Sequence, residues 1–511
     1  MPLIRAFALI PALLIATAMP GHAQKAKDTL RIAFADHIST ILQVDDPKGD
    51  TRATTDAVFD TLVCYDAPSK SFKPLLATSW KQVDDLTLEF KLRDDVKFHD
   101  GSTLTADDVV YTLNWLVDPN NKLRYDELNW MAKAVKLDAT TVQIVSKSKT
   151  PIALMRIALS AHIYPAKIHA AFETKSDFGR KNPVGTGPYK VVSVDSSKGI
   201  VLVKNGLYRA INDCKPAATI GTIQITPILD SQTRMAQLMV GGIDLTRADN
   251  NDEVKMATAV PTLMSTATTG VIFHYLAFDA IGRSGVAPLS NPKVRQALVQ
   301  GINRDLIMKT VVAGGDQVKI VNAICVSMQQ GCVEPTIKPF PYDAAAAKRL
   351  LTEAGYPNGF DLEITAMPAS HSLGEALTGE LRKLGIRANL EKVSFPTYRS
   401  KQVAGKLQAL AGQWTSLGLP DLAPTMDFYF SGQRDYWNDA DIKALAAEAA
   451  ESLDLKVRET AYRKIFDRIN ERSYILPLST MPGVFIHTKD IQIAPDSINV
   501  YGAVFQELRW K

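Results

Sequence analysis

The chain has 511 residues, which is too many for a single hydrophobic core, so its length predicts about two to four domains. Hydrophobic residues make up 46% and charged residues 22%, the composition of an ordinary soluble globular protein. The net charge of +4 is small, and no basic run interleaved with aromatic residues indicates a nucleic-acid groove, so we expect no nucleic-acid partner.

The first residues predict the compartment. MPLIRAFALIPALLIATAMPGHA has one early arginine, an apolar run from Phe7 to Met19 and a Gly-x-Ala ending at Ala23. This pattern is typical of a cleavable signal peptide (1–23). A membrane anchor would need about 18 apolar residues, and Pro11 interrupts a shorter run. Because no cysteine stands beside the cleavage point, we expect a periplasmic protein without a lipid anchor.

Short strands alternate with turns from the first strand to about residue 220. Apolar alternation predicts strands at 29–35, 87–92, 141–146, 189–194 and 199–204. Longer helical patterns separated by strands follow between about 279 and 473, which together indicate an α/β block. They include a helix capped by Asn291 with Pro292 in its first turn, and a helix closed by Gly355.

Four cysteines suit an oxidising compartment: Cys64, Cys214, Cys325 and Cys332. Cys325 and Cys332 flank a short loop, and this spacing favours a disulfide between them. Cys64–Cys214 is then a second pairing that the sequence allows, with buried free thiols as the alternative. No pair has the spacing of a zinc site.

The segment KLRDDVKFHDGSTLTADDVVYTL concentrates His, Asp and Ser, but structure explains it better than catalysis. Members of a catalytic triad converge in space, whereas neighbours in sequence point apart. His99 to Ser102 is turn chemistry between a strand and a helix. Thr105 is placed to cap that helix, with Asp107 and Asp108 at its positive end.

The segment NPVGTGPYK (182–190) looks like a phosphate loop but lacks the G-K-[ST] that such a loop requires. It also leads into a strand instead of opening a helix, so a Gly/Pro turn that lines a cleft is the better interpretation. No G-x-S-x-G or H-E-x-x-H motif is present, and the eight histidines are scattered. We therefore expect no enzymatic activity, no cofactor and no metal site.

The segment LQALAGQWTSLGLPDLAPTMDFYF (407–430) is a candidate ligand pocket. A strand ends at Trp414, and a pliable Gly/Pro-rich stretch with only two charges, Asp421 and Asp427, follows. An aromatic side chain at a strand end beside a loop suits a pocket, and core packing is the equally open alternative.

Four blocks of the sequence resemble signature blocks of one family, the peptide/nickel-type extracellular solute-binding proteins of ABC importers. The blocks stand in the order of the family, and the likeness extends over nearly the whole mature chain. They are LLATSWKQVDDLTLEFKLRDDVKFHDGSTLTADDVVYTL, NPVGTGPYKV, NPKVRQALVQGINRDLIM and LLTEAGYPNGFDLEI.

The resemblance implies an α/β, two-lobed periplasmic binding protein of the venus-flytrap type, with an extra subdomain on lobe one. Lobe one would comprise 24–277, with the subdomain at about 62–184, and lobe two 278–475, before a return to lobe one over 476–511. The crossings would then fall near Tyr275–Asp279 and Tyr474–Leu478. The partners would be a small-molecule or peptide ligand and permease subunits in the inner membrane, and the protein would be a monomer.

The resemblance also indicates which ligands this chain can bind. In dipeptide-binding relatives an aspartate three positions after the tryptophan holds the peptide amine, and an arginine three positions after a Met-Pro pair holds the carboxylate. Here these places are Leu417 and His371, so both charged anchors are absent and a free dipeptide is disfavoured, since unpaired buried charges are costly. Asp421 is the candidate substitute for the missing acid.

Further candidate ligand residues lie at the first crossing, in the Gly/Pro turn and in the His37–Thr40 loop after the first strand. They are Tyr275, Phe278, Gly185, Thr186, Gly187, Ile38 and Thr40. The expected function is a periplasmic receptor that captures a small solute, foremost a peptide, and delivers it to a permease. A receptor for an oligosaccharide or an opine-like conjugate is the alternative, and an exported hydrolase is a third and weaker one.

Overall fold

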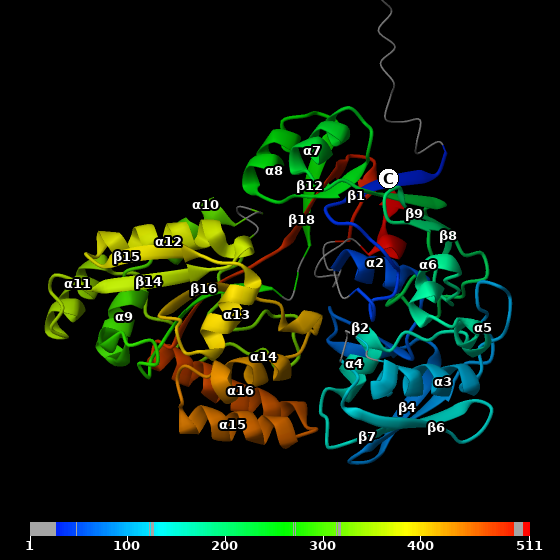
Figure 1. Cartoon of the computed structure of the whole chain (residues 1–511), viewed down its shortest axis with the longest axis horizontal. Helices are drawn as coiled ribbons and strands as arrows, with labels where there is room; N and C mark the ends of the chain where they lie inside the picture. Colours follow the sequence, from blue (N-terminus) through cyan, green and yellow to red (C-terminus); the bar gives the residue numbers. More distant parts are fainter. Residues whose placement is uncertain are drawn as a thin grey trace, which may run out of the picture.

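The computed structural model describes residues 27–46, 49–121, 123, 127–268, 270, 272–312, 314, 318–494 and 504–511. The predicted signal peptide (1–23) lies outside these residues. Two lobes lie side by side, each built on its own sheet with helices around it (Figure 1). The predicted α/β, two-lobed fold is therefore confirmed. None of the helices in the described part of the chain is long and apolar enough to cross a bilayer.

Lobe one is built on a seven-stranded mixed sheet. Its central strand, β1, pairs in parallel with β10 on one side and β11 on the other. In order across the sheet the strands are β12 (Leu263–Thr268), β18 (Gly483–Thr488), β11 (Leu245–Arg247), β1 (Thr29–Phe34), β10 (Thr222–Pro227), β9 (Gly199–Lys204) and β8 (Tyr189–Asp195). The C-terminal β18 lies between β12 and β11, so the end of the chain returns to lobe one.

A second, antiparallel sheet forms the extra subdomain of lobe one. Its strands are β4 (Ala77–Asp84), β5 (Thr87–Leu92), β7 (Thr141–Ser146) and β6 (Met131–Lys136). Helix α3 (Ala106–Val117) packs on it. Thr105 and Asp108 form the capping box of this helix, so the predicted helix start is confirmed.

Lobe two is built on a five-stranded sheet in which parallel and antiparallel pairs meet. The order is β15 (Arg387–Lys392), β14 (Asp361–Ala366), β16 (Ala409–Trp414), β13 (Phe273–Phe278) and β17 (Ile475–Thr480). Its helices are α9 (Pro292–Gln300), α10 (Arg304–Val311), α11 (Ala344–Glu353), α12 (His371–Lys383), α13 (Phe395–Val403), α14 (Ala423–Phe430), α15 (Ala440–Glu451) and α16 (Leu455–Glu471).

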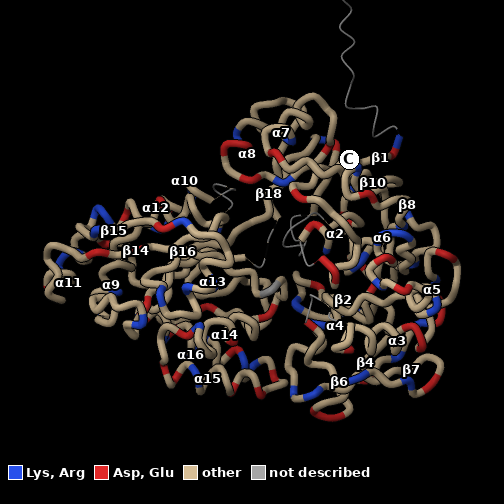
Figure 2. Tube along the Cα trace, in the orientation of Figure 1, with Lys and Arg blue, Asp and Glu red and all other residues tan. Residues whose placement is uncertain are grey.

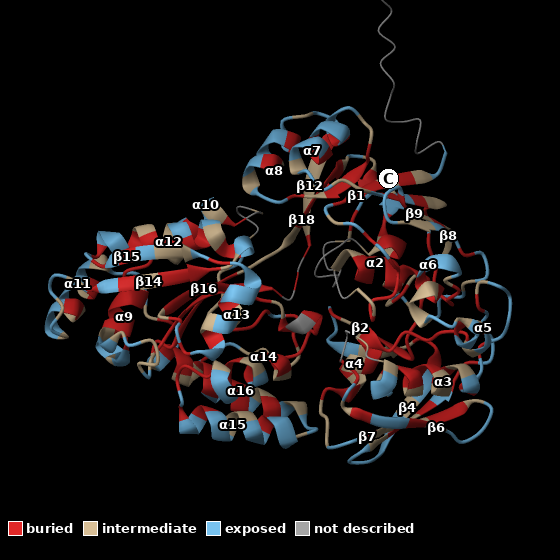
Figure 3. Cartoon of the chain, viewed as in Figure 1, coloured by how far each residue is buried: buried red, intermediate tan, exposed pale blue. Residues whose placement is uncertain are grey.

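The remaining α-helices and strands belong to lobe one. The helices are α2 (Gly49–Val58), α4 (Ala153–Ser160), α5 (Ala166–Ala171), α6 (Phe178–Lys181), α7 (Ser231–Met239) and α8 (Asn251–Thr258). Two short ribbons, β2 (Val63–Asp66) with β3 (Ser71–Pro74) and β19 (Ile491–Gln492) with β20 (Arg509–Trp510), complete the fold. The strands of the lobe-two sheet around β13 and β16 are buried, and the outward helix faces are exposed (Figure 3).

The chain passes between the two main sheets after β12 and again after β17. The predicted crossings, Tyr275–Asp279 and Tyr474–Leu478, lie instead mainly in β13 and β17, and the predicted boundaries after 277 and 475 fall inside these strands. The reason is burial: every residue of β13 is buried, and β13 pairs with β16 and β17 along its length. A fully buried strand with partners on both sides, such as β13, is part of the sheet, and the crossing lies beside it.

His99 locks the Gly/Pro turn of residues 185–187 to the subdomain. Its backbone N–H donates to the Gly185 carbonyl (2.8 Å), its Nδ1 accepts from the Gly185 N–H (3.2 Å), and its Nε2 lies 3.1 Å from the Gly187 carbonyl. The neutral ring with its proton on Nε2 satisfies both ring contacts, since Nδ1 then accepts and Nε2 donates. Burial lowers the pKa of His99 to about 4. The apparent triad is therefore part of the scaffold.

The turn needs glycine because it presses on the end of α2. A Cβ on Gly185 would lie 2.0 Å from the Val58 carbonyl oxygen, and one on Gly187 would lie 2.6 Å from that of Ala57. Between them the Thr186 hydroxyl donates to Asp60 (2.8 Å). The turn thus joins the subdomain to the core of lobe one.

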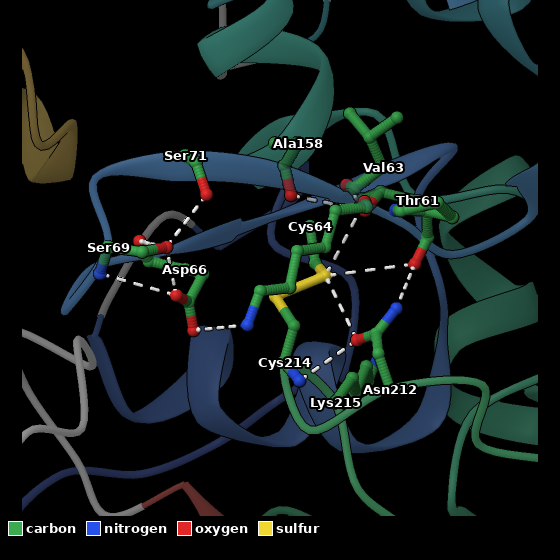
Figure 4. The surroundings of a disulfide bond; sticks show 12 residues. Thr61, Val63, Cys64, Asp66, Ser69, Ser71, Ala158, Asn212, Cys214 and Lys215 are labelled. Atoms are coloured by element: carbon green, nitrogen blue, oxygen red, sulfur yellow. Dashed lines mark hydrogen bonds and ion pairs between the residues drawn. A yellow bond between two sulfur atoms is a disulfide. The ribbon is translucent and has the colours of Figure 1, made fainter. Parts of the chain in front are cut away.

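Both pairs of cysteines suggested by the sequence are disulfide-bonded, Cys64 to Cys214 and Cys325 to Cys332. The first ties β2 to the loop before β10, beside Asn212 (Figure 4). The Asn212 amide donates to the Pro74 carbonyl (2.7 Å) and its oxygen accepts from the Cys214 N–H (2.9 Å). This crosslink holds the β2–β3 ribbon against the loop that leads into β10.

We predict that His99→Ala lowers the free energy of unfolding by about 1–3 kcal/mol at neutral pH, because buried hydrogen bonds of the turn are lost. The folded-state pKa of His99 lies below its unfolded value, so its contribution is complete above about pH 6.5 and declines toward pH 4. The gap between wild type and variant in urea melts should therefore narrow as the pH falls. His37→Ala, at an exposed histidine, is the control and should follow wild type. A gap that is constant with pH would contradict this account.

Candidate ligand cleft between the lobes

A cavity of about 1480 Å³ lies between lobe two and the extra subdomain of lobe one. The lobe-one wall comes from α4 and the residues before it: Ser148, Lys149, Thr150, Pro151, Ile152 and Arg156. The opposite wall comes from the ends of β14 and β16 and from α13, α14 and the short helix η7 (Gly432–Arg434). Solute bound here would contact both lobes.

Strand direction explains why these residues of lobe two meet. β14 and β16 are parallel, so their carboxyl ends lie at the same edge of the sheet. Met367 follows the last residue of β14, and Trp414 is the last residue of β16; both line the cavity. The carboxyl edge of parallel strands is where open α/β sheets bind ligands.

Trp414 is anchored in an aromatic cluster at this edge. Its indole N–H donates to the Thr425 hydroxyl (2.8 Å), its ring lies 4.1 Å from that of Phe428, and Tyr429 packs edge-on at 5.5 Å. Trp414 is only 7% exposed, whereas Phe428 is half-buried. Trp414 therefore supports the wall, and Phe428 presents more of the aromatic surface.

Tyr275 forms the floor of the cavity beside Trp414. It pairs with Gly412 across β13 and β16, and a Cβ on Gly412 would lie 2.5 Å from the Tyr275 ring. The missing side chain of Gly412 thus makes room for the ring. Tyr275 also packs edge-on against Tyr429 (5.5 Å), and burial raises its pKa well above the ordinary value, so it is neutral.

The Cys325–Cys332 loop is one place where lobe two touches lobe one; another is Asn251 of α8, which donates to the Val312 carbonyl (2.8 Å) and accepts from the Gly314 N–H (3.0 Å). The Tyr65 hydroxyl of lobe one donates to the Met328 carbonyl (3.2 Å), and the Gln330 amide donates to the Lys70 carbonyl (3.2 Å). Gln330 is in turn held to lobe two through the Pro420 carbonyl (2.8 Å). The disulfide loop therefore bridges the lobes at one edge of the cleft.

Two of the predicted ligand residues, Trp414 and Tyr275, line the cavity together. Leu417 lies nearby, in the short helix η6 (Ser416–Gly418), and His371 is the first residue of α12, just beyond the cavity residues Met367 to Ala369.

The other predicted ligand residues are built into the two cores. Phe278 is buried in the core of lobe two, and Ile38 and Thr40 are buried in lobe one, where the Thr40 hydroxyl accepts from the Leu42 N–H. The turn of Gly185, Thr186 and Gly187 packs on α2 as described. None of these residues is part of the cavity lining.

Asp421 is fully buried and forms an ion pair with Arg458 of α16. It also accepts from the Ala423 N–H (2.8 Å) at the start of α14. Burial alone would lower the pKa of Arg458, but the Asp421 carboxylate raises it above its ordinary value. Asp421 thus balances a buried charge of lobe two instead of facing the cleft.

A family model matches residues 71–437: Bacterial extracellular solute-binding proteins, family 5 Middle. The chain belongs to this family. The family provides the solute-binding components of ABC importers, and this is the role of the chain, as the four sequence blocks predicted.

Curated relatives match over most of their length. The Glutathione-binding protein GsiB of Escherichia coli (strain K12) is 28% identical, covering 95% of this chain and 96% of the relative. Heme-binding protein A of Haemophilus influenzae is 26% identical, covering 84% and 83%. Among solved structures, the periplasmic binding protein DppA of Helicobacter pylori in complex with the peptide STSA has a TM-score of 0.73 at 23% identity, covering 95% and 99%. The last likeness supports the fold.

The sequence did not indicate several residues that line the cleft of this family 5 protein. They are Phe395, Tyr398, Arg399, Phe428 and Arg434. Only the DFYF run of α14, already inside the segment around Trp414, was a signal. The arginines lie in two separate segments that meet at Phe428 only after folding.

We predict that Asp421→Asn lowers the free energy of unfolding by about 3–5 kcal/mol, because Arg458 would keep a buried charge without its partner. The double variant Asp421→Asn/Arg458→Gln should lose less than the sum of the two single variants in denaturant melts. Asp361→Asn, which removes an exposed ion pair with Arg387, is the control and should cost no more than about 1 kcal/mol. Unchanged stability of Asp421→Asn together with weaker solute binding would contradict this assignment.

Proposed function

We propose that this family 5 protein is a periplasmic receptor that captures a peptide in the cleft between its lobes and delivers it to the permease subunits of an ABC importer. The observation that carries the proposal is the 1480 Å³ cavity lined from both lobes. This volume exceeds the roughly 300–1,000 Å³ of sites for drug-sized ligands and suits a short peptide.

The lining suits a peptide with apolar side chains. Aromatic residues and Met367 provide apolar contact, while Gln413, Thr415 and Thr150 offer polar atoms for a peptide backbone. A relative named for glutathione and a structural neighbour in complex with the peptide STSA support capture of a peptide-like solute. Export through cleavage after Ala23, action as a monomer and absence of catalysis belong to the same proposal.

Capture requires the lobes to move. A solute that contacts both walls binds the closed state more tightly than the open one and shifts the population toward it. The hydrogen bonds that bridge the lobes, from the Cys325–Cys332 loop and from Asn251, are each worth about 0.5–1.5 kcal/mol, so they permit opening.

Ligand pools test the receptor function directly. Peptide, oligosaccharide and opine pools would be screened by thermal shift, since a ligand at about 100 times its Kd adds about 2.7 kcal/mol of stability. We expect the peptide pool to stabilise the mature protein and X-ray scattering to show compaction on binding. Failure of all pools, without compaction, would contradict the proposal; hydrolysis of model peptides or esters that is lost in His99→Ala would favour a hydrolase instead.

Two aromatic variants distinguish a residue that contacts the solute from one that supports the cleft wall. From the sequence alone, Trp414→Ala is expected to weaken ligand binding much more than it lowers the stability of the unliganded protein. Given its burial and stacking, we now expect Trp414→Ala to cost about 3–5 kcal/mol of stability as well. Phe428→Ala should weaken peptide binding about tenfold or more with a smaller loss of stability. Tyr342→Ala, at an exposed tyrosine outside the cavity lining, is the control and should change neither the peptide affinity nor the stability measured by calorimetry. Peptide affinity unchanged in Phe428→Ala would contradict the assigned wall.

A further inference from the structure

The lining of the cleft carries more positive than negative charge. Its cationic residues are Lys149, Arg156, Arg399 and Arg434, and Asp427 is the acidic one. Over the molecule as a whole, by contrast, cationic and anionic residues are interspersed on both lobes (Figure 2). The excess of cations is thus a local feature of the cleft.

On the lobe-one wall the positive charges have protein partners. Lys149 Nζ lies 3.3 Å from Asp85 Oδ2. Arg156 Nη1 donates to the Glu127 carbonyl (2.8 Å) and lies 3.8 Å from the Glu127 carboxylate. These two cations are largely used in holding the subdomain together.

On the lobe-two wall the arginines have no carboxylate partner among the described residues. The Arg434 and Arg399 guanidinium carbons lie 4.7 Å and 5.5 Å from the ring centroid of Phe428. Arg399 also donates to the Gln402 side chain (2.5 Å). Both arginines are half-buried, where an unbalanced charge interacts more strongly with an anion than it does in water.

Stacking on an aromatic ring orients a guanidinium for recognition. The flat face rests on the ring, and the N–H donors in its plane stay available for a carboxylate, which they can hold in a bidentate manner. Two such groups converge on one ring, and that ring packs on Trp414 at the floor of the cleft.

We propose that Arg399 and Arg434 form a carboxylate-binding subsite, and that the solute is an anionic peptide-like molecule whose carboxylate lies beside an apolar group. The apolar group packs on Phe428 while the carboxylate pairs with the arginines. The inference rests on the proposed receptor function and names the substrate class of the same cleft. It replaces the charged anchors that are absent at Leu417 and His371.

The subsite also explains how a solute would favour closure. Closing the cleft covers the two arginines with the lobe-one wall, whose own cations already pair with Asp85 and Glu127, and it takes unbalanced positive charge out of water, which costs free energy. A carboxylate paired with the arginines balances that charge. An anionic solute therefore stabilises the closed form more than a neutral solute of the same size does.

The test uses two tripeptide pools of identical sequences, one with a free C-terminal carboxylate and one with a C-terminal amide. Calorimetry should show about tenfold or tighter binding of the carboxylate pool to the wild-type protein, and this preference should weaken at high salt. The double variant Arg399→Gln/Arg434→Gln should lose the preference while still binding the amide pool. Arg387→Gln, at an exposed arginine outside the cleft lining, is the matched control and should keep it.

The outcomes distinguish the subsite from the receptor function. Equal binding of both pools, or a preference retained by the double variant, would overturn the subsite while the receptor function stands. Binding of an uncharged oligosaccharide pool in place of both peptide pools would overturn the subsite and the choice of a peptide as solute, while the role as a receptor stands. If no pool binds, the receptor function fails and the subsite with it. Should the double variant not fold, the comparison of the two pools on wild-type protein still decides.

Discussion

The separation of the two lobes is the constraint on which the cleft depends. In the described part of the chain, the backbone passes between the seven-stranded and the five-stranded sheet at two places, each directly beside a buried strand. A small loop closed by Cys325–Cys332 adds the contacts to Tyr65 and Lys70, and Asn251 of α8 adds hydrogen bonds to Val312 and Gly314. With so few connections, the space between the lobes can change, and a solute that bridges them has a large influence on it.

The walls of the cleft contribute to binding through both their shape and their charge. Trp414 and Tyr275 are buried and hold the edge of the sheet in place, so the surface offered by Phe428 is fixed before any solute arrives. Preorganisation of this kind reduces the entropy lost on binding. Arg399 and Arg434 then add a directed positive charge to a surface that is otherwise apolar, which gives the cleft selectivity as well as affinity.

Local chemistry in the sequence was enough to predict much of the fold. Alternation and turn residues placed β5 and β7 at their observed bounds, and Thr105 with Asp108 marked the start of α3. Pairings across the chain were harder to infer. Asp421 resembled a ligand residue because its partner, Arg458, lies 37 positions away on another helix. Phe278 suggested a hinge, although it is part of a strand buried on both faces.

The candidate site shows the same division. Trp414 was found because it ends a strand, a local signal, whereas Arg399 and Arg434 were missed because their meeting at Phe428 depends on how α13, α14 and η7 pack. The family resemblance directed attention to positions 371 and 417, where the charged anchors are missing. The positive charge of the cleft lies instead on Arg399 and Arg434, on the wall formed by these helices.

Native mass spectrometry of the protein purified from the periplasm of its host tests the central claim most directly. The account predicts that a small solute with at least one carboxylate co-purifies with the wild-type protein and is absent from Arg399→Gln/Arg434→Gln. Recovery of a neutral solute, or of the same solute in equal amount with the double variant, would contradict it.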